Sequence, residues 1–309
     1  MRFIASTLLG LALAGRASSA QDLIVFNAGS LARPLRAAAD SFAAREKITI
    51  ALESAGSLET ARKITELGKT PDIIALADPE VFPQLLMPRH VSWYALFARN
   101  RMVIAYTATS RFASELSAQT WPSVLQRAGV ETGRADPDLD PNGYRTLLLL
   151  QLAERFYAQP GLAARLLAAS PPRNIRPKSA DLVALLQAGE FDYIWAYESV
   201  AQAAGLAFLR LPPEIDLGEP ADSARYAAAS VRVAGNTPRD SVTFHGAPIA
   251  FALSIPANAP HSATAAKFIV YLFSDDGQRV LRAAKLDVLV RPVITGARAP
   301  DAIARLARP

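Results

Sequence analysis

The sequence contains no cysteine. The chain can therefore form no disulfide bond and has no thiolate for catalysis, and it offers no cysteine for lipid attachment behind an N-terminal leader. Histidine is also scarce. The 309 residues include three histidines, and they lack the spacing of a zinc site: His90, His245 and His261. These absences argue against a thiol enzyme, a zinc site and a lipoprotein.

Sequence motifs of common catalytic sites are also lacking. There is no Gly-x-Ser-x-Gly elbow, no Gly-x-x-x-x-Gly-Lys phosphate loop and no Gly-x-Gly-x-x-Gly fingerprint. The spacing of Asp136, Asp138 and Asp140 suggests a calcium loop. However, Pro141 stands where that loop needs glycine, and Leu147 stands where it needs glutamate. We expect no enzymatic activity, no calcium site and no resident cofactor.

The first twenty residues are typical of a leader. Arg2 precedes the apolar run 3–14, and the small residues Ser18, Ser19 and Ala20 form a cleavage site. The run is too short to span a bilayer. We expect residues 1–20 to be a signal peptide cleaved after Ala20, and the mature protein to lie free in the periplasm. The net charge of +5 gives no sign of a nucleic-acid partner in a chain of this size.

The phrase Ala-Gly-Ser-Leu occurs twice, at 28–31 and 55–58, each time after an apolar run typical of a strand. After each copy the apolar residues take helical spacing, which predicts a strand, a turn at glycine and a helix that begins near the serine. The apolar run 72–77 predicts a third strand, covered on both faces. Residues 22–78 are therefore predicted to form β-α-β-α-β.

The duplicated phrase has two interpretations. Free N–H groups and the dipole at a helix start favour a bound anion, and ligands of open α/β sheets bind at the carboxyl ends of the strands. Ser30 and Ser57 would then bind one anion between them. The alternative is that both are ordinary capping serines.

The rest of the chain predicts a second lobe. The aromatic segment 93–106 looks like a crossover out of the first unit. A turn-rich loop at 133–145 and helices at 144–157 and 180–188 follow, the second capped by Ser179, and then a strand at 191–197. The run 248–253 predicts a return strand, and we expect helices to fill the C-terminal part. The sequence thus predicts two β/α lobes, joined by crossover strands, with a ligand cleft between them: lobe 1 comprises 22–103 plus 246–309, and lobe 2 comprises 104–245.

Several motifs in order resemble the periplasmic molybdate/tungstate-binding proteins of ABC transporters, and among them the tungstate-binding branch. The resemblance extends from about Leu23 to Pro292. The matching segments are Ala28–Leu31, Ala55–Ser57 with Ala61–Lys69, Phe97–Asn100 with Met102–Tyr106, Asp140-Pro141-x-Gly143-Tyr144-Arg145, Tyr197-x-Ser199-Val200-Ala201, and Leu211-Pro212-x-Glu214-Ile215-x-Leu217.

The resemblance implies a class II periplasmic binding protein that closes on a tetrahedral oxyanion. It implies that Ser30 and Ser57 bind the anion through hydroxyls and amides, and that Asn142 and Ser179 offer backbone N–H groups from the other lobe. Tyr197 matches a hydroxyl donor, and Asp140 matches a carboxylate that contacts the metal of the oxyanion. The implied partners are the anion and a membrane permease, with the protein a monomer.

One family position differs. The second carboxylate of the tungstate-binding branch immediately precedes the tyrosine, where this chain has Ala196. Glu198 lies two residues later, a displacement of about 7 Å along a strand, so we do not expect it to substitute. For Tyr144 and Arg145 we expect a structural role. An exported hydrolase stays an alternative, although the sequence offers no base for Ser30 or Ser57. A second alternative is the same fold tuned to sulfate, phosphate or a small organic acid, as a transport component or a sensor.

Overall fold

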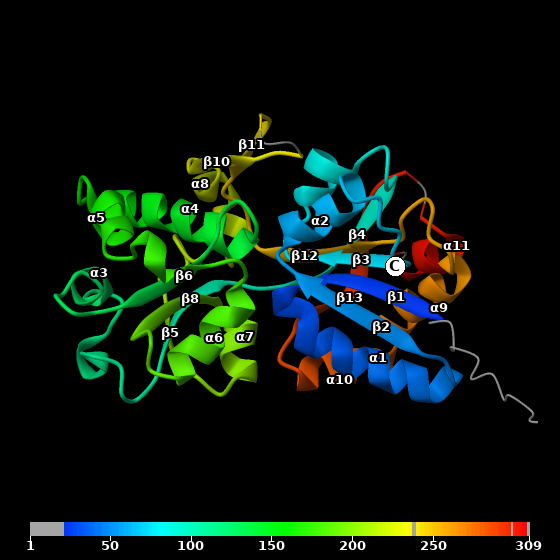
Figure 1. Ribbon diagram of the computed structural model, residues 1–309, viewed down its shortest axis with the longest axis horizontal. Helices are drawn as coiled ribbons and strands as arrows, with labels where there is room; N and C mark the ends of the chain where they lie inside the picture. The colour runs from blue at the N-terminus through cyan, green and yellow to red at the C-terminus, as the bar shows by residue number, and fades with distance from the viewer. Residues whose placement is uncertain (1–21, 237–238, 298, 308–309) are drawn as a thin grey trace, which may run out of the picture.

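The computed structural model describes residues 22–236, 239–297 and 299–307. The expected signal peptide, residues 1–20, lies outside the described residues. Within these ranges, no helix combines the length and the hydropathy that a membrane crossing requires. The elements form two lobes side by side along the long axis of the molecule (Figure 1), which confirms the expected two-lobed α/β fold.

The first lobe is built on a six-stranded mixed sheet with the order β13-β4-β12-β3-β1-β2. Strands β1, β2 and β3 are parallel to one another, and β12 is antiparallel to both of its neighbours. The strands are β1 (Leu23–Ala28), β2 (Ile50–Ala55), β3 (Ile73–Leu76), β4 (Trp93–Arg99), β12 (Ala250–Ser254) and β13 (Asp287–Gly296). The helices are α1 (Ala32–Glu46), α2 (Ser57–Thr65), α9 (Ser262–Leu272), α10 (Asp275–Ala283) and α11 (Asp301–Ala304).

The second lobe has a five-stranded sheet with the order β7-β6-β8-β5-β9. Its strands are β5 (Met102–Tyr106), β6 (Thr132–Ala135), β7 (Ile175–Arg176), β8 (Tyr193–Tyr197) and β9 (Ala207–Arg210). Its helices are α3 (Trp121–Val124), α4 (Pro141–Phe156), α5 (Leu162–Ala168), α6 (Ser179–Gln187), α7 (Glu198–Ala203) and α8 (Ser223–Tyr226). A separate hairpin, β10 (Ser230–Ala234) with β11 (Ser241–His245), adjoins α4 through a hydrogen bond from Gln151 Nε2 to Ser230 O (2.8 Å).

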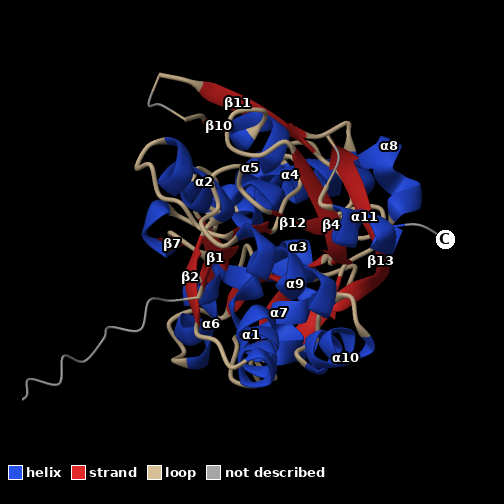
Figure 2. Ribbon diagram, turned by 90° about the vertical axis from the view of Figure 1, so that its right-hand side faces the viewer, coloured by secondary structure: helices blue, strands red, loops and turns tan. Residues whose placement is uncertain are grey.

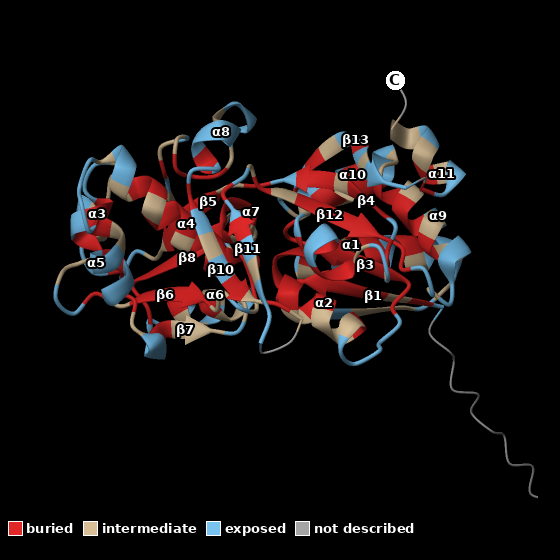
Figure 3. Cartoon of the chain, turned by 90° about the horizontal axis from the view of Figure 1, so that it is seen from above, coloured by how far each residue is buried: buried red, intermediate tan, exposed pale blue. Residues whose placement is uncertain are grey.

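Short single turns complete the chain. They are η1 (Gly29–Leu31), η2 (Phe82–Leu86), η3 (Ala113–Glu115), η4 (Pro172–Asn174), η5 (Pro220–Asp222) and η6 (Arg305–Ala307). Helices flank the sheets of both lobes, whereas β13, β10 and β11 are largely exposed (Figures 2 and 3). All four residues of β3 are at most 1% exposed, as predicted for a strand covered on both faces.

The lobes are joined by the predicted crossover and return. Asn100 N–H donates to Ile249 O (3.1 Å), and Met102 N–H donates to Asp216 O (2.8 Å). The sequence boundary after residue 103 falls inside β5, which pairs with β8 and β9. Strand pairing therefore puts the change of sheet at Asn100 and Arg101, because the backbone leaves β4 there and enters the second sheet at Met102.

Two predictions about local structure were wrong in detail. The C-terminal part is not all helical, because residues 287–296 form β13 at the edge of the first sheet. Pro292 lies where its register shifts, between Val288 and Val293, a position that tolerates the missing N–H of proline. In addition, α4 begins at Pro141 rather than near Tyr144, because the Asp140 side chain caps it.

Candidate functional site

The two Ala-Gly-Ser-Leu phrases lie side by side. Ala28 and Ala55 are register partners in the parallel pair of β1 and β2, so Ser30 and Ser57 follow neighbouring strand ends. Ser57 is the first residue of α2, with Gly56 at the N-cap, and Ser30 lies in η1. The turn into a helix at both strand ends therefore puts two serines at one edge of the sheet, as the sequence predicts.

In the second lobe, Asp140 joins two helix starts. Its Oδ1 accepts a hydrogen bond from Asn142 N–H at the start of α4 (2.9 Å). Its Oδ2 accepts from Ser179 N–H (2.9 Å) and Ser179 Oγ–H (3.0 Å) at the start of α6. The two backbone amides that the resemblance implies for the anion thus both donate to the Asp140 carboxylate in this structure.

Burial raises the pKa of Asp140. The donors on Ser179 and Asn142, and the charge of Arg145, lower it in part. The carboxylate is 3% exposed, so its negative charge lacks solvent and depends on these donors. Asp140 therefore acts as an internal hydrogen-bond acceptor at the start of α6, and it does not point into solvent.

The two lobes meet at these helix starts. Leu58 N–H of α2 donates to Leu139 O (3.2 Å), immediately before Asp140. A Cβ on Gly56 would lie 2.2 Å from the same Leu139 oxygen, and one on Gly29 would lie 3.6 Å from Ala180 Cβ in α6. The starts of η1, α2, α4 and α6 therefore converge between the lobes, which are in contact.

Arg62 of α2 adds a second contact across the lobes. Its guanidinium donates to three backbone carbonyls: Nη1 to Asp138 O (2.8 Å), Nε to Gly235 O (3.0 Å) and Nη2 to Ala234 O (2.6 Å). We call this contact the Arg62 clasp. It ties the first lobe to the loop before α4 and to the end of β10.

Tyr197 and Ser57 are linked through Arg145. Arg145 Nη1 donates to Tyr197 Oη (2.7 Å) and to Ala77 O (2.6 Å), and Ala77 N–H donates to Ser57 Oγ (3.0 Å). Both hydroxyl oxygens accept in these bonds, so each hydroxyl keeps its hydrogen for another acceptor. Burial raises the pKa of Tyr197, which keeps it a neutral donor.

Asp78 is the counter-charge that the sequence analysis missed. Its Oδ2 lies 3.0 Å from Arg145 Nη2 and accepts from Tyr144 Oη–H (2.5 Å). Burial acts to lower the pKa of Arg145, but the charge of Asp78, together with Tyr197 and Tyr144, outweighs it and the pKa is raised. Asp78 follows β3 just as the serines follow β1 and β2, so the same strand-end reasoning would have found it. The bonds of Tyr144 and Arg145 to Asp78 fit the expected structural role.

The buried polar atoms near these helix starts that make no hydrogen bond in the described part of the chain include Ser30 Oγ and Asn142 Oδ1. Ser30 is 8% exposed, and burying a hydroxyl without a partner costs free energy. Ser30 also lines a cavity of about 220 Å³ between α1, α6 and α7. A hydroxyl without a partner, in a residue that lines a cavity, is available to a ligand.

Glu198 does not substitute for the missing carboxylate at Ala196. Its oxygens accept from Arg210 Nη2 (2.6 Å) and Gln202 Nε2 (2.7 Å), on the hinge side of α7. Across the described ranges, no three acidic or histidine side chains group together as a metal site. Asp140 is thus the carboxylate that lies among the predicted site residues.

Comparisons with known proteins show the family and the fold. Residues 23–284 match the family of bacterial extracellular solute-binding proteins. A solute-binding protein of Petrotoga mobilis is 40% identical over 261 residues, covering 84% of this chain and 81% of the relative. The molybdate/tungstate-binding protein WtpA of Pyrococcus abyssi is 34% identical over 301 residues, covering 89% of this chain and 86% of that protein. In fold, the chain is similar to the periplasmic molybdate-binding protein of Azotobacter vinelandii, with a TM-score of 0.61 at 16% identity over 85% of this chain and 98% of that one.

Proposed function

Because the chain belongs to the family of bacterial extracellular solute-binding proteins, we propose that it captures a tetrahedral oxyanion, tungstate or molybdate, for an ABC importer. The observation that supports this most is the convergence of Ser30 and Ser57 from one lobe with Asp140 and Ser179 from the other. The relatives named molybdate/tungstate-binding protein support the choice of anion.

The site binds a dianion through hydrogen-bond donors. Ser30, Ser57 and Tyr197 supply hydroxyls, and the starts of α2, α4 and α6 supply amides. A hydrogen bond to a charged group contributes about 1.5–3 kcal/mol, so six give roughly 9–18 kcal/mol. After the cost of ordering and closure, this reaches the roughly 12 kcal/mol of nanomolar binding.

Asp140 has to respond when the anion binds. A carboxylate beside a dianion is repelled unless it takes a proton, turns away or bonds to the metal. We propose that Asp140 releases the Asn142 and Ser179 amides to the oxyanion and contacts its molybdenum or tungsten atom. The second carboxylate position of the tungstate-binding branch holds Ala196 here. We therefore assign only Asp140 as a carboxylate that contacts the metal.

The cellular setting follows from the same proposal. Residues 1–20 act as a signal peptide, and the mature chain diffuses as a monomer in the periplasm and delivers the anion to a membrane permease. It has no resident cofactor and no enzymatic activity, since the serine hydroxyls act as donors to the anion and not as nucleophiles.

Titration calorimetry with molybdate, tungstate, sulfate and phosphate tests the proposed function. We expect molybdate and tungstate to bind with the highest affinity, and Ser30→Ala to lower that affinity about 10-fold or more, because a bond to a charge is lost. The same change removes a hydroxyl that lacks a partner, so the free energy of unfolding of the ligand-free protein should not fall. Failure to bind any of the four anions would refute the proposal.

A second candidate is the same fold with another ligand: sulfate, phosphate or a small organic acid, for transport or as a sensor. Ala196 favours it, because one carboxylate of the tungstate-binding branch is missing. Preference for sulfate in the same titrations, together with no gain in tungstate affinity from Ala196→Glu, would select this candidate.

A further inference from the structure

Arg145 of α4 is a buried cation with partners in both lobes. Its side chain is 4% exposed, and Asp78 Oδ2 of the first lobe lies 3.0 Å from its Nη2. Its Nη1 donates to Ala77 O of the first lobe (2.6 Å) and to Tyr197 Oη of the second (2.7 Å). Arg145 therefore reaches its counter-charge only while the two lobes are in contact.

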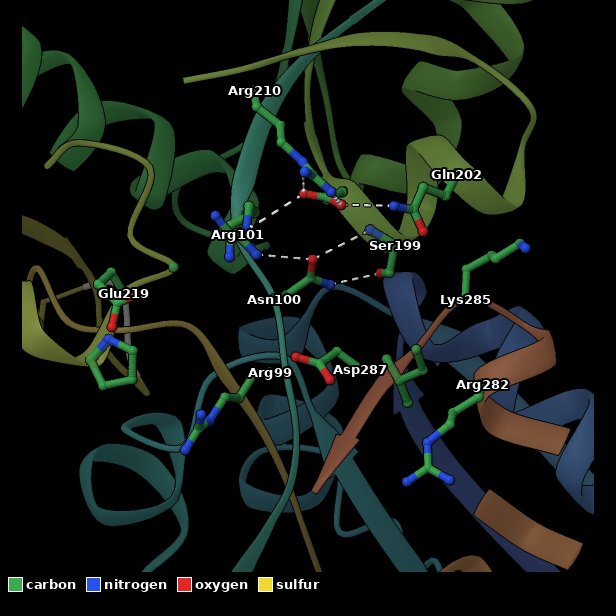
Figure 4. A pocket seen from close by; sticks show the side chains of 14 residues that line it. Arg99, Asn100, Arg101, Ser199, Gln202, Arg210, Glu219, Arg282, Lys285 and Asp287 are labelled. Atoms are coloured by element: carbon green, nitrogen blue, oxygen red, sulfur yellow. Dashed lines mark hydrogen bonds and ion pairs between the residues drawn. The ribbon is translucent and has the colours of Figure 1, made fainter. Parts of the chain in front are cut away.

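The arginines at the hinge are paired in another way. Arg101 and Arg210 border a cavity of about 570 Å³ there (Figure 4), and they lie 3.5 Å and 2.6 Å from Glu198. Their side chains are 39% and 63% exposed, so water weakens these ion pairs. Glu198 and Arg210 belong to the second lobe and Arg101 to the crossover, so these ion pairs do not depend on closure. The pairing of Arg145, in contrast, changes when the lobes move.

Arg145 also fixes two hydroxyls of the proposed site. A hydroxyl oxygen accepts through its lone pairs, and its single hydrogen goes to another acceptor. Tyr197 Oη accepts from Arg145, and Ser57 Oγ accepts from Ala77 N–H (3.0 Å). The carbonyl of Ala77 in turn accepts from Arg145. Arg145 thus contacts Tyr197 directly and Ser57 through the backbone of Ala77, and both hydroxyl hydrogens are left for the anion.

Asp78 and Tyr144 hold the guanidinium in place. Tyr144 Oη–H donates to Asp78 Oδ2 (2.5 Å), the same oxygen that pairs with Arg145. The Tyr144 ring stacks on Phe244 of β11, with the ring centroids 4.6 Å apart. Asp78 is 7% exposed and Tyr144 is 1% exposed, so little water competes for these bonds. A planar guanidinium with partners on several sides cannot rotate freely, so its N–H groups keep their direction.

We propose that Arg145 is a positioning residue for the bound oxyanion: in the closed state it holds the hydroxyls of Ser57 and Tyr197 so that both hydrogens point to the anion. This inference rests on the proposed function and adds a residue that acts without touching the anion. When the lobes separate, Asp78 and Ala77 leave with the first lobe, and Arg145 loses the partners that hold its guanidinium. Closure and the orientation of the donors are therefore coupled.

A double-mutant cycle, measured by calorimetry with molybdate, tests this role. Arg145→Met removes the N–H groups, and we expect it to lower the affinity about 10-fold or more. In a Tyr197→Phe background the same change should cost at least about 3-fold less, because the hydroxyl through which Arg145 acts is already gone. If Arg145 only supported the fold, the change would cost the same in both backgrounds.

The matched control is Tyr193→Phe. Tyr193 is buried on the same strand, β8, and its hydroxyl donates to Arg111 O. This hydroxyl has no bond with Arg145 in the described part of the chain. In the Tyr193→Phe background, Arg145→Met should therefore lower the affinity as much as it does in the wild type.

Arg145→Lys covers the case in which Arg145→Met does not fold. Lysine keeps the charge beside Asp78 but lacks the planar fork that binds several partners at once. We expect Arg145→Lys to lower the affinity about 3-fold or more in the wild-type background and less than about 2-fold with Tyr197→Phe. Unchanged affinity, or the same cost in both backgrounds, would overturn the positioning role and leave the proposed function intact. If the wild-type protein binds no oxyanion, the proposed function fails, and this role fails with it.

Discussion

The protonation state of Asp140 affects both the stability of the protein and the binding of the anion. Burial raises its pKa, so over a range above about 3.9 it holds a proton that an exposed aspartate has lost. The folded protein then binds the proton more tightly than the unfolded chain does. The contribution to stability is complete below the unfolded pKa and is lost as the pH rises through the folded pKa.

The proposed contact with the metal of the oxyanion needs the ionised carboxylate, so a proton on Asp140 competes with it. We therefore predict that the affinity for molybdate decreases as the pH falls from about 8 towards the raised pKa of this group. Asp140→Asn should flatten that dependence, since asparagine does not titrate. Calorimetric titrations of both proteins across the pH range test this, and equal slopes would contradict it.

Residue by residue, the strand-end argument found Ser30 and Ser57, because the position of a serine after a strand is local information. The bonds from Ser179 and Asn142 to Asp140 are not local. They depend on how the starts of α4 and α6 meet, and this packing cannot be calculated from spacing. The position of Asp78 after β3 is also local information, but its pairing with Arg145 depends on packing in the same way.

Among the elements, the approach of α2 to the loop before α4 depends on the absence of a side chain at Gly56. A Cβ there would lie 2.2 Å from Leu139 O, a backbone atom that moves only if the loop or the lobe moves. Its backbone angles, φ −64° and ψ 151°, suit alanine equally well. Gly56→Ala should therefore disturb the contact between the lobes and leave each lobe folded.

We predict that Gly56→Ala lowers molybdate affinity about 10-fold or more, because closure has to overcome the clash. Gly29→Ala is the matched control. Its Cβ would lie 3.6 Å from Ala180 Cβ, an ordinary contact, so closure should persist. Calorimetry gives the affinities, and small-angle scattering reports how far the lobes close. Equal affinities for the two variants would count against this role of Gly56.

The alternation of strands and helices was predictable as far as β3, and so were the crossover and the return, because each has a clear apolar period. The hairpin of β10 and β11 was not predicted. Its alternating residues are partly exposed and pair only with each other, so they lack a strong apolar pattern. β13 was missed because Pro292 is unusual in a strand.

For the whole molecule, the Arg62 clasp favours the closed arrangement. We predict that Arg62→Ala increases the radius of gyration of the ligand-free protein in small-angle scattering and weakens molybdate binding. Three hydrogen bonds of about 0.5–1.5 kcal/mol each are lost from the closed state alone. Arg279→Ala, which removes an exposed arginine paired within α10, is the control and should change neither quantity. An unchanged radius in Arg62→Ala would show that the clasp does not set closure.

The position of β12 has a consequence for the order of folding. Residues 250–254 lie between β3 and β4 in the first sheet, so that sheet stays divided until this late strand is available. The second sheet uses only strands between Met102 and Arg210. When the chain is synthesised from its N-terminus, the first lobe therefore begins to form before the second lobe but is completed after it.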